Sequence, residues 1–279
     1  MSAVVLVIEI YGGVKGGSLA LLSDAGHVFG DIFSLIITFV ALRIASLPAN
    51  TRRTFGYHRA EVFAALINGL TLLGLAFFIV YAAYGRLSTQ PHVQGSLVTM
   101  VAFLGLLPNL WTVWQLRNET NLNIQSAFLH AASDAASSIL VLASGLLITF
   151  SGIYILDPII SFIIALLIII SAARLLKSAF VILFEGVPEH FKLGEVSQKL
   201  CGLKDVAGSH DLHLWTICSD VVHLTAHLVV RDHLTTKQAN VISKNAAKLL
   251  EPYGIHHVTF QFETPETACE KAFKCEILH

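Results

Sequence analysis

Charged residues are scarce in this sequence. They make up 13% of its 279 residues, whereas a soluble domain usually carries about a quarter. Hydrophobic residues reach 54%, and the mean hydropathy is +0.69. Residues 1–178 hold 16 of the 37 charged residues, and the remaining 101 residues hold 21. This distribution excludes an ordinary soluble protein and predicts a membrane-embedded domain, 1–178, followed by a soluble domain, 179–279.

Net charge and cysteine content are also low. A formal charge of −1 excludes a strongly basic nucleic-acid-binding protein. The four cysteines lack the dense spacing of a disulfide framework; they are Cys201, Cys218, Cys269 and Cys275. The sequence has no Gly-x-x-x-x-Gly-Lys-Ser/Thr phosphate loop and no His-Glu-x-x-His pattern. Neither ATP-driven work nor zinc-protease chemistry is therefore expected.

Long apolar runs are plentiful by contrast. A transmembrane helix needs about 20 largely apolar residues, and five stretches reach that length: 18–45, 62–84, 97–116, 124–150 and 153–172. A sixth run, 3–11, is too short to cross, because a glycine-rich turn at 12–17 is expected to end it. We interpret it as the second half of a first span whose beginning is not in this sequence. The sequence thus predicts an all-α bundle of six transmembrane helices, the first one shortened.

The segments between these spans differ in positive charge. Two basic residues, Lys15 and Arg86, fall on one side of the membrane and seven on the other. The seven are Arg43, Arg52, Arg53, Arg59, Arg117, Arg174 and Lys177. Such an excess is typical of the cytosolic side. A multi-pass protein with its soluble domain and both termini in the cytosol is therefore expected.

The soluble domain has its own pattern. Helices are predicted at 193–202 and 235–251, and strands with period-two alternation at 206–217, 221–230 and 256–263. The order α-β-β-α-β predicts a small α+β, ferredoxin-like sandwich. Nine of the 13 histidines lie in this domain.

A hairpin turning near Ser219 would gather many of these histidines on one face. The expected cross-strand pairs are Asp211 with His227, His213 with Thr225 and Trp215 with His223. Leucines and valines take the other face, which the helices cover. The polar face offers a cytosolic zinc site; its candidate ligands are Asp211, His213, His223, His227 and, from the third strand, Glu263. The alternative is that these side chains simply form a dimer interface.

The second and fifth apolar runs each contain His-x-x-x-Asp, as His27 with Asp31 and His130 with Asp134. Positions i and i+4 lie on one helical face, so each pair can direct an imidazole and a carboxylate at one point. An Asp at mid-span costs about 2.5–3.5 kcal/mol on insertion scales. Two such pairs predict a four-coordinate site with two nitrogen and two oxygen ligands, a set that zinc takes readily. For a single pair, a packed hydrogen-bonding group is the competing interpretation.

Three other carboxyl groups in the apolar domain are weaker candidates. Glu9 is expected to make a structural polar contact, and the alternative is that it lines an ion path. Asp24 is expected either to cap its helix or to attract cations. Asp157 precedes Pro158 near the start of the last span and is expected to be that helix's N-cap.

Four segments resemble the cation diffusion facilitator family, in particular its bacterial zinc, cobalt and cadmium efflux proteins. They are 18–27 (SLALLSDAGH), 53–61 (RTFGYHRAE), 126–134 (SAFLHAASD) and 210–217 (HDLHLWTI). The resemblance implies a homodimeric antiporter of metal ions and protons, with six spans and a cytoplasmic domain of metallochaperone type that binds metal and dimerises.

The resemblance also implies roles for individual residues. It places the transport ligands at His27, Asp31, His130 and Asp134, and it adds His210 as a cytoplasmic ligand next to His227. The 117–123 loop lacks the histidine-rich insert of many eukaryotic zinc transporters, which favours a prokaryotic type in the cell inner membrane. Arg53 and Tyr57 stand where some relatives have histidines, so no metal site is assigned to that loop.

The function predicted from the sequence is efflux of a divalent cation, zinc foremost, in exchange for protons. Cobalt, cadmium and nickel are further candidate cargoes, because imidazole and carboxylate also bind them. No cofactor is expected, and zinc would be both cargo and regulatory ligand. The alternatives are a membrane-anchored zinc sensor and an intramembrane zinc enzyme. A weaker metal-binding group comprises Cys269, Cys275 and His279.

Overall fold

The computed structural model describes residues 2–117, 122–218, 221–231 and 234–265. The chain divides into two compact units, and each is described by itself. The helical unit comprises Met1–Val40 and Ala64–Leu176, and the sheet unit comprises Ala41–Phe63 and Lys177–His279. The segment that joins the second and third helices therefore belongs with the C-terminal part of the chain.

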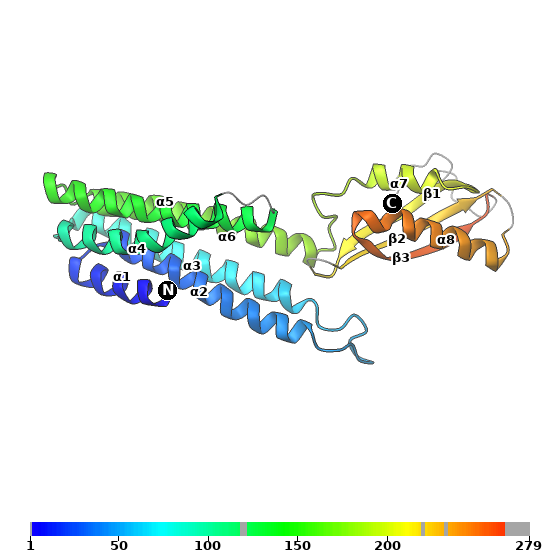
Figure 1. The fold of residues 1–279 in the computed structure, drawn as a ribbon, viewed down its shortest axis with the longest axis horizontal. Helices are drawn as coiled ribbons and strands as arrows, with labels where there is room; N and C mark the ends of the chain where they lie inside the picture. Colours follow the sequence, from blue (N-terminus) through cyan, green and yellow to red (C-terminus); the bar gives the residue numbers. More distant parts are fainter. Residues whose placement is uncertain (1, 118–121, 219–220, 232–233, 266–279) are drawn as a thin grey trace. The chain divides into compact units, whose positions relative to one another are not determined.

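Six helices occupy the N-terminal two thirds of the described chain: α1 (Ser2–Gly16), α2 (Leu19–Ala45), α3 (Ala60–Thr89), α4 (Gly95–Leu116), α5 (Leu122–Ser151) and α6 (Leu156–Leu183). Figure 1 shows them as long, nearly parallel rods. Within the described residues, α2 to α6 are long and apolar enough to cross a membrane, as the sequence predicted. The helix α1 has 15 residues, so the sixth span stays a prediction.

The glycine-rich segment does not end α1 at residue 11, and that expectation was wrong. The helix continues to Gly16, and the chain turns at Gly17, whose φ is +66°. A Cβ atom on Gly12 would lie 2.7 Å from a methyl group of Val101 on α4. The glycines therefore serve close packing between helices, a role that helix propensity alone does not reveal.

Asp157 fixes the start of α2 rather than that of its own helix. It lies inside α6, is 1% exposed, and accepts hydrogen bonds from the backbone N–H groups of Leu19 and Ala20 at 2.7 and 3.3 Å. The Ser18 hydroxyl also donates to it, and Arg86 lies 3.4 Å away. The sequence correctly predicted a capping carboxylate but attached it to the wrong helix, because a cap can come from any neighbouring element.

The sheet unit contains the predicted α-β-β-α-β order. Its elements are α7 (Leu193–Cys201), β1 (Val206–Thr216), β2 (Val222–Val230), α8 (Thr236–Leu250), the short 3₁₀ helix η1 (Glu251–Tyr253) and β3 (Ile255–Glu263). The strand order is β1-β2-β3; β1 and β2 pair antiparallel, and β2 and β3 pair parallel. A reciprocal capping box of Thr235 and Gln238 starts α8.

The two faces of this sheet differ as predicted. Buried leucines and valines of β1 and β2 pack with residues of α7 and α8, such as Leu200 and Ile242, into one core. In Figure 1 both helices run beside the sheet. Val258, Phe260 and Phe262 of β3 pack against the same core. The opposite face carries the histidines and carboxylates.

The predicted register is correct at one end of the hairpin and wrong at the other. His213 pairs with Thr225 and Trp215 with His223, as predicted. His227, however, lies opposite His210 rather than Asp211. The register shifts between His210 and His213, where Asp211 adopts a positive φ of 48°. A β-bulge inserts one residue and inverts the alternation that follows, so period-two reasoning failed there.

Candidate metal centres

The two His-x-x-x-Asp pairs come together between α2 and α5. His27 Nε2 lies 3.0 Å from Asp134 Oδ1, within hydrogen-bond distance. His130 Nε2 lies 3.8 Å from both Asp31 Oδ2 and Asp134 Oδ2. Each helix contributes one imidazole and one carboxylate, so the structure brings all four predicted residues into one cluster.

The four side chains are not equivalent. One ligand atom each from His27, Asp31 and Asp134 lies within 4.8 Å of the others, a spacing that suits a shared metal ion. The side chains of His27 and Asp134 are 18% and 17% exposed, whereas His130 is 60% exposed and stands at the edge of the cluster. His130 Nε2, 3.8 Å from both carboxylates, is the fourth candidate ligand of a tetrahedral set.

Asp24 ties the two ligand-bearing helices together. It is 2% exposed, and it accepts hydrogen bonds from the hydroxyl groups of Ser137 at 2.6 Å and Ser138 at 3.0 Å. Ser137 lies less than one helical turn beyond Asp134. Asp24 therefore bridges α2 and α5 beside the ligands and is neither a helix cap nor an open cation funnel.

Glu9 is a further buried carboxyl group of the helical unit. It is 1% exposed on α1, and its Oε2 atom has no hydrogen-bond partner among the described residues. Both Glu9 and His27 interact electrostatically with Asp24. The surroundings of His27 are thus rich in carboxyl groups, an arrangement that favours a divalent cation over an anion or a neutral molecule.

A second cluster occupies the polar face of the sheet unit. His210 Nε2 lies 2.9 Å from Glu263 Oε2, and His227 Nδ1 lies 3.0 Å from Glu263 Oε1. His227 Nε2 also lies 3.4 Å from Asp211 Oδ2, and His213 Nε2 lies 2.9 Å from Asp211 Oδ1. One atom each from His210, His227 and Glu263 falls within a common 4.8 Å, which suits a metal ion.

The carboxylates of this second cluster are held in their ionised form. The pKa of Asp211 is lowered, chiefly by the hydrogen bond from His213 and further by the neighbouring histidines. Burial acts to raise the pKa of Glu263, but hydrogen bonds from His210 and Gln261 outweigh it and lower the pKa overall. Metal binding requires deprotonated ligands, so both groups are prepared for it.

His223 is the one predicted cytoplasmic ligand that lies apart from this cluster. Its ring stacks between Trp215 at 5.5 Å and His257 at 4.6 Å. His257 was not among the predicted ligands, and the structure places it in register with His223 on β2. Cys269, Cys275 and His279 lie outside the described residues.

Comparison with known proteins gives matches over nearly the whole chain. Residues 1–184 match the Cation efflux transmembrane domain, and residues 188–265 match the Cation efflux protein, cytoplasmic domain. The chain is similar to the "Cadmium, cobalt and zinc/H(+)-K(+) antiporter" of Bacillus subtilis, with 37% identity over 275 residues that cover 97% of this chain and 88% of that protein.

Two other relatives carry related names. The "Metal cation efflux system protein CzcD" of Cupriavidus metallidurans is 38% identical, covering 96% of this chain and 84% of that protein. The "Zinc transporter ZitB" of Escherichia coli is 33% identical, covering 92% and 83%. These are multi-pass transporters rather than enzymes, which agrees with the helices of this chain. From its matches at both domains, the chain belongs to the cation efflux family.

Proposed function

We propose that this protein exports divalent cations, zinc foremost, from the cytosol in exchange for protons. The observation that carries the proposal is the cluster of two imidazoles and two carboxylates on α2 and α5, with His27, Asp31 and Asp134 offering ligand atoms within 4.8 Å of one another. Such groups are costly in an apolar bundle unless they are paired or bind an ion. The cluster is therefore assigned as the transport site.

The ligand chemistry favours zinc among the candidate cargoes. Imidazole nitrogen suits zinc, copper, iron and nickel, whereas manganese and magnesium prefer sites made only of oxygen atoms. The names of the relatives include cadmium, cobalt and zinc, which supports the same metals for this chain. Nickel is a further candidate on ligand chemistry alone.

Proton exchange follows from the contact between His27 and Asp134. At 3.0 Å this is a hydrogen bond. A metal ion bound by both side chains would displace the proton that they share. Zinc requires a neutral imidazole and an ionised carboxylate, so binding expels protons and protonation expels zinc. Rocking of α2 and α5 around a fixed site would then load zinc from the cytosol and release it outside. The name of the Bacillus subtilis relative includes H⁺ antiport, which supports this cycle.

The remaining assignments rest on charge and on the cytoplasmic cluster. The excess of Lys and Arg on one side supports an inner-membrane protein with both termini in the cytosol. The cluster of His210, His227 and Glu263, which Asp211 and His213 adjoin, is proposed to bind regulatory zinc. The match to the cytoplasmic domain of the family supports a homodimer. No cofactor is required for this cycle, because zinc is the cargo.

Zinc uptake into inside-out membrane vesicles tests this function. Uptake should require an acidic vesicle interior and should stop when an ionophore collapses the pH gradient. Asp31→Ala should abolish uptake while the variant still inserts into the membrane and elutes as a folded protein. Uptake that is unaffected by collapse of the gradient would contradict the antiport. A sensor or an enzyme would show no zinc flux at all.

A further inference from the structure

Two histidines of the sheet unit form a pair outside both metal clusters. His223 on β2 and His257 on β3 are directly registered across the parallel ladder. Their ring centroids are 4.6 Å apart, and the ring planes differ by 9°. Neighbouring strands lie about 4.7–4.9 Å apart, so both imidazoles stand side by side on the same face of the sheet.

The environment of His223 leaves one ring nitrogen without a partner. Its Nε2 is buried and has no hydrogen-bond partner within the described part of the chain. Trp215 stacks on the ring at 5.5 Å, and Phe55 meets it edge-on at 5.3 Å. A buried polar atom without a partner is rare in folded proteins, and an ion is one of its recognised explanations.

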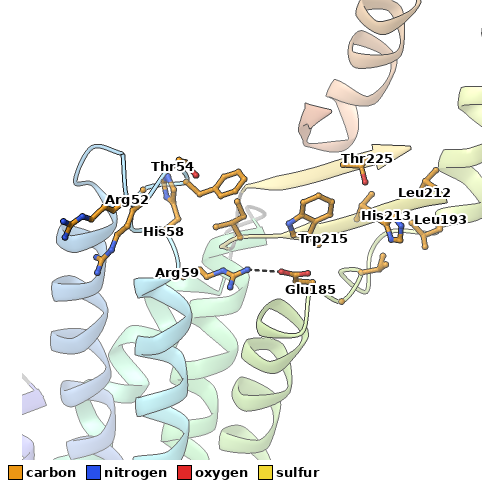
Figure 2. A pocket seen from close by; sticks show the side chains of 17 residues that line it. Arg52, Thr54, His58, Arg59, Glu185, Leu193, Leu212, His213, Trp215 and Thr225 are labelled. Atoms are coloured by element: carbon orange, nitrogen blue, oxygen red, sulfur yellow. Dashed lines mark hydrogen bonds and ion pairs between the residues drawn. The ribbon is translucent and has the colours of Figure 1, made fainter. Parts of the chain in front are cut away.

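A cavity opens in front of this pair within the same unit. It has a volume of about 380 Å³, and a third histidine, His58, lines it together with His223 and His257. The remaining lining comes mainly from residues 45–56 and the turn end of the hairpin. A larger cavity of about 790 Å³ adjoins it and shares His58, Phe55 and Ile217 in its lining. In Figure 2, Trp215 and His58 are seen in this larger cavity, where Arg59 faces Glu185 at 3.3 Å.

We propose that His223 and His257, with His58 as a third ligand, bind a divalent transition-metal ion at a site distinct from the cluster of His210, His227 and Glu263. His223 and His227 are four residues apart on β2, which is about 13 Å at the strand rise per residue. One ion cannot bridge that distance. The two sites therefore bind separate ions on the same face of the sheet.

The chemistry of the three groups suits a borderline metal such as zinc. Three neutral imidazoles make a zinc site with one position left open, for water or for an exchangeable ligand. Burial, together with the neighbouring His257, lowers the pKa of His223.

The chain supplies its own reporter for this site. It has three tryptophans, of which Trp111 and Trp114 lie on α4 and only Trp215 stacks on His223. In the full-length protein carrying W111F and W114F, Trp215 fluorescence is recorded while Zn²⁺ is added, and again with Co²⁺, which quenches nearby tryptophan. Bound metal per chain is measured in parallel by equilibrium dialysis.

Four variants of that protein decide the proposal. H223N with H257N should remove the Trp215 response and one bound zinc per chain, and H58N should weaken the response. H257N alone should also remove the response. Because His257 is exposed, this variant controls for a folding defect in the double variant. H256N, the exposed neighbour on β3, is the matched control and should change nothing.

Two further backgrounds distinguish this site from the other cluster and from transport. In a background of H210N, H227N and E263Q, the Trp215 response should persist. The response should persist equally in D31N, so its fate is independent of zinc flux. An undiminished zinc count and Trp215 response in both H257N and the H223N/H257N variant would overturn the proposal and leave the three rings as an aromatic stack.

Discussion

The two histidine and carboxylate clusters use the same chemistry on different backbones. In the helical unit, the ligands come from two helices that are joined at this point by side chains alone. In the sheet unit, they come from three strands tied by backbone hydrogen bonds, with a β-bulge at Asp211. The key side chains are similarly shielded, with His27 at 18% and His210 at 11% exposure. The difference lies in how freely the ligands can move apart.

This difference in ligand mobility distinguishes a site that can transport a metal ion from a site that retains one. Packed helices can tilt or slide by small amounts at low cost, so a site shared between them can open alternately to two sides. Strands in a ladder cannot separate without losing their hydrogen bonds. The cluster between α2 and α5 is thus suited to transport, and the cluster on the sheet to retention of zinc.

The largest effect is expected from Asp134→Asn. Asp134 contacts both His27 and His130, so its loss removes the centre of the proposed transport site. Zinc flux should fall by roughly 100-fold or more, since even indirect support of a metal ligand is worth about 10- to 100-fold. Flux is measured in proteoliposomes, with His92→Asn as a control imidazole outside the cluster. A variant that transports zinc at the wild-type rate would contradict the assignment of this cluster as the transport site.

Glu263→Gln should have a smaller effect on flux and a clear one on metal content. Glu263 joins His210 and His227, so its loss should remove bound zinc from the sheet unit. Transport should fall by less than about tenfold, because the cluster between α2 and α5 is intact. Metal content per chain and flux are measured on one preparation. Equal loss of flux in E263Q and D134N would erase the distinction between the two clusters.

The sequence revealed the helical cluster more completely than the sheet cluster. On a helix, His27 and Asp31 are one turn apart whatever the tertiary structure, so spacing alone puts them on one face. On the sheet, the bulge at Asp211 places His210 rather than Asp211 opposite His227. Nothing local in the sequence specifies that bulge, and His210 was reached only through the family resemblance.

Tertiary partners were the other part that the sequence did not reveal. The cap supplied by Asp157 and the bridge from Asp24 to Ser137 and Ser138 join residues more than 100 positions apart. Both carboxylates were recognised as out of place in an apolar run, but their partners depend on helix packing. The glycines of α1 were likewise mistaken for a turn, because their packing partners lie on other helices.

The bridge at Asp24 can be tested through stability. Ser137→Ala with Ser138→Ala leaves a buried carboxylate without two of its donors. The free energy of unfolding should drop by about 1–3 kcal/mol for each lost hydrogen bond, seen as a lower Tm in detergent. Ser144→Ala is the control, since this buried hydroxyl has no partner in the described ranges. An equal drop in Tm for both variants would refute the bridging role.

The smallest effect is the acid sensitivity of the metal-free sheet unit. The pKa values of Asp211 and Glu263 are lowered in the folded state, so their contribution to stability is fully present above the unfolded values near about pH 4. It is lost as pH falls through the lower folded values. The full chain with chelator should lose a little stability there, and D211N with E263Q should flatten that slope. An unchanged slope would show that these carboxylates are not stabilised by their neighbours.

The central claim is that one cluster exchanges zinc for protons, and simultaneous flux measurement tests it most directly. Proteoliposomes are loaded with a pH dye and a zinc dye, and zinc is added outside without an imposed gradient. Zinc entry through the wild-type protein should be matched by proton exit, and Asp31→Asn should lose both signals together. Zinc entry without proton exit, or zinc entry that survives Asp31→Asn, would contradict the account.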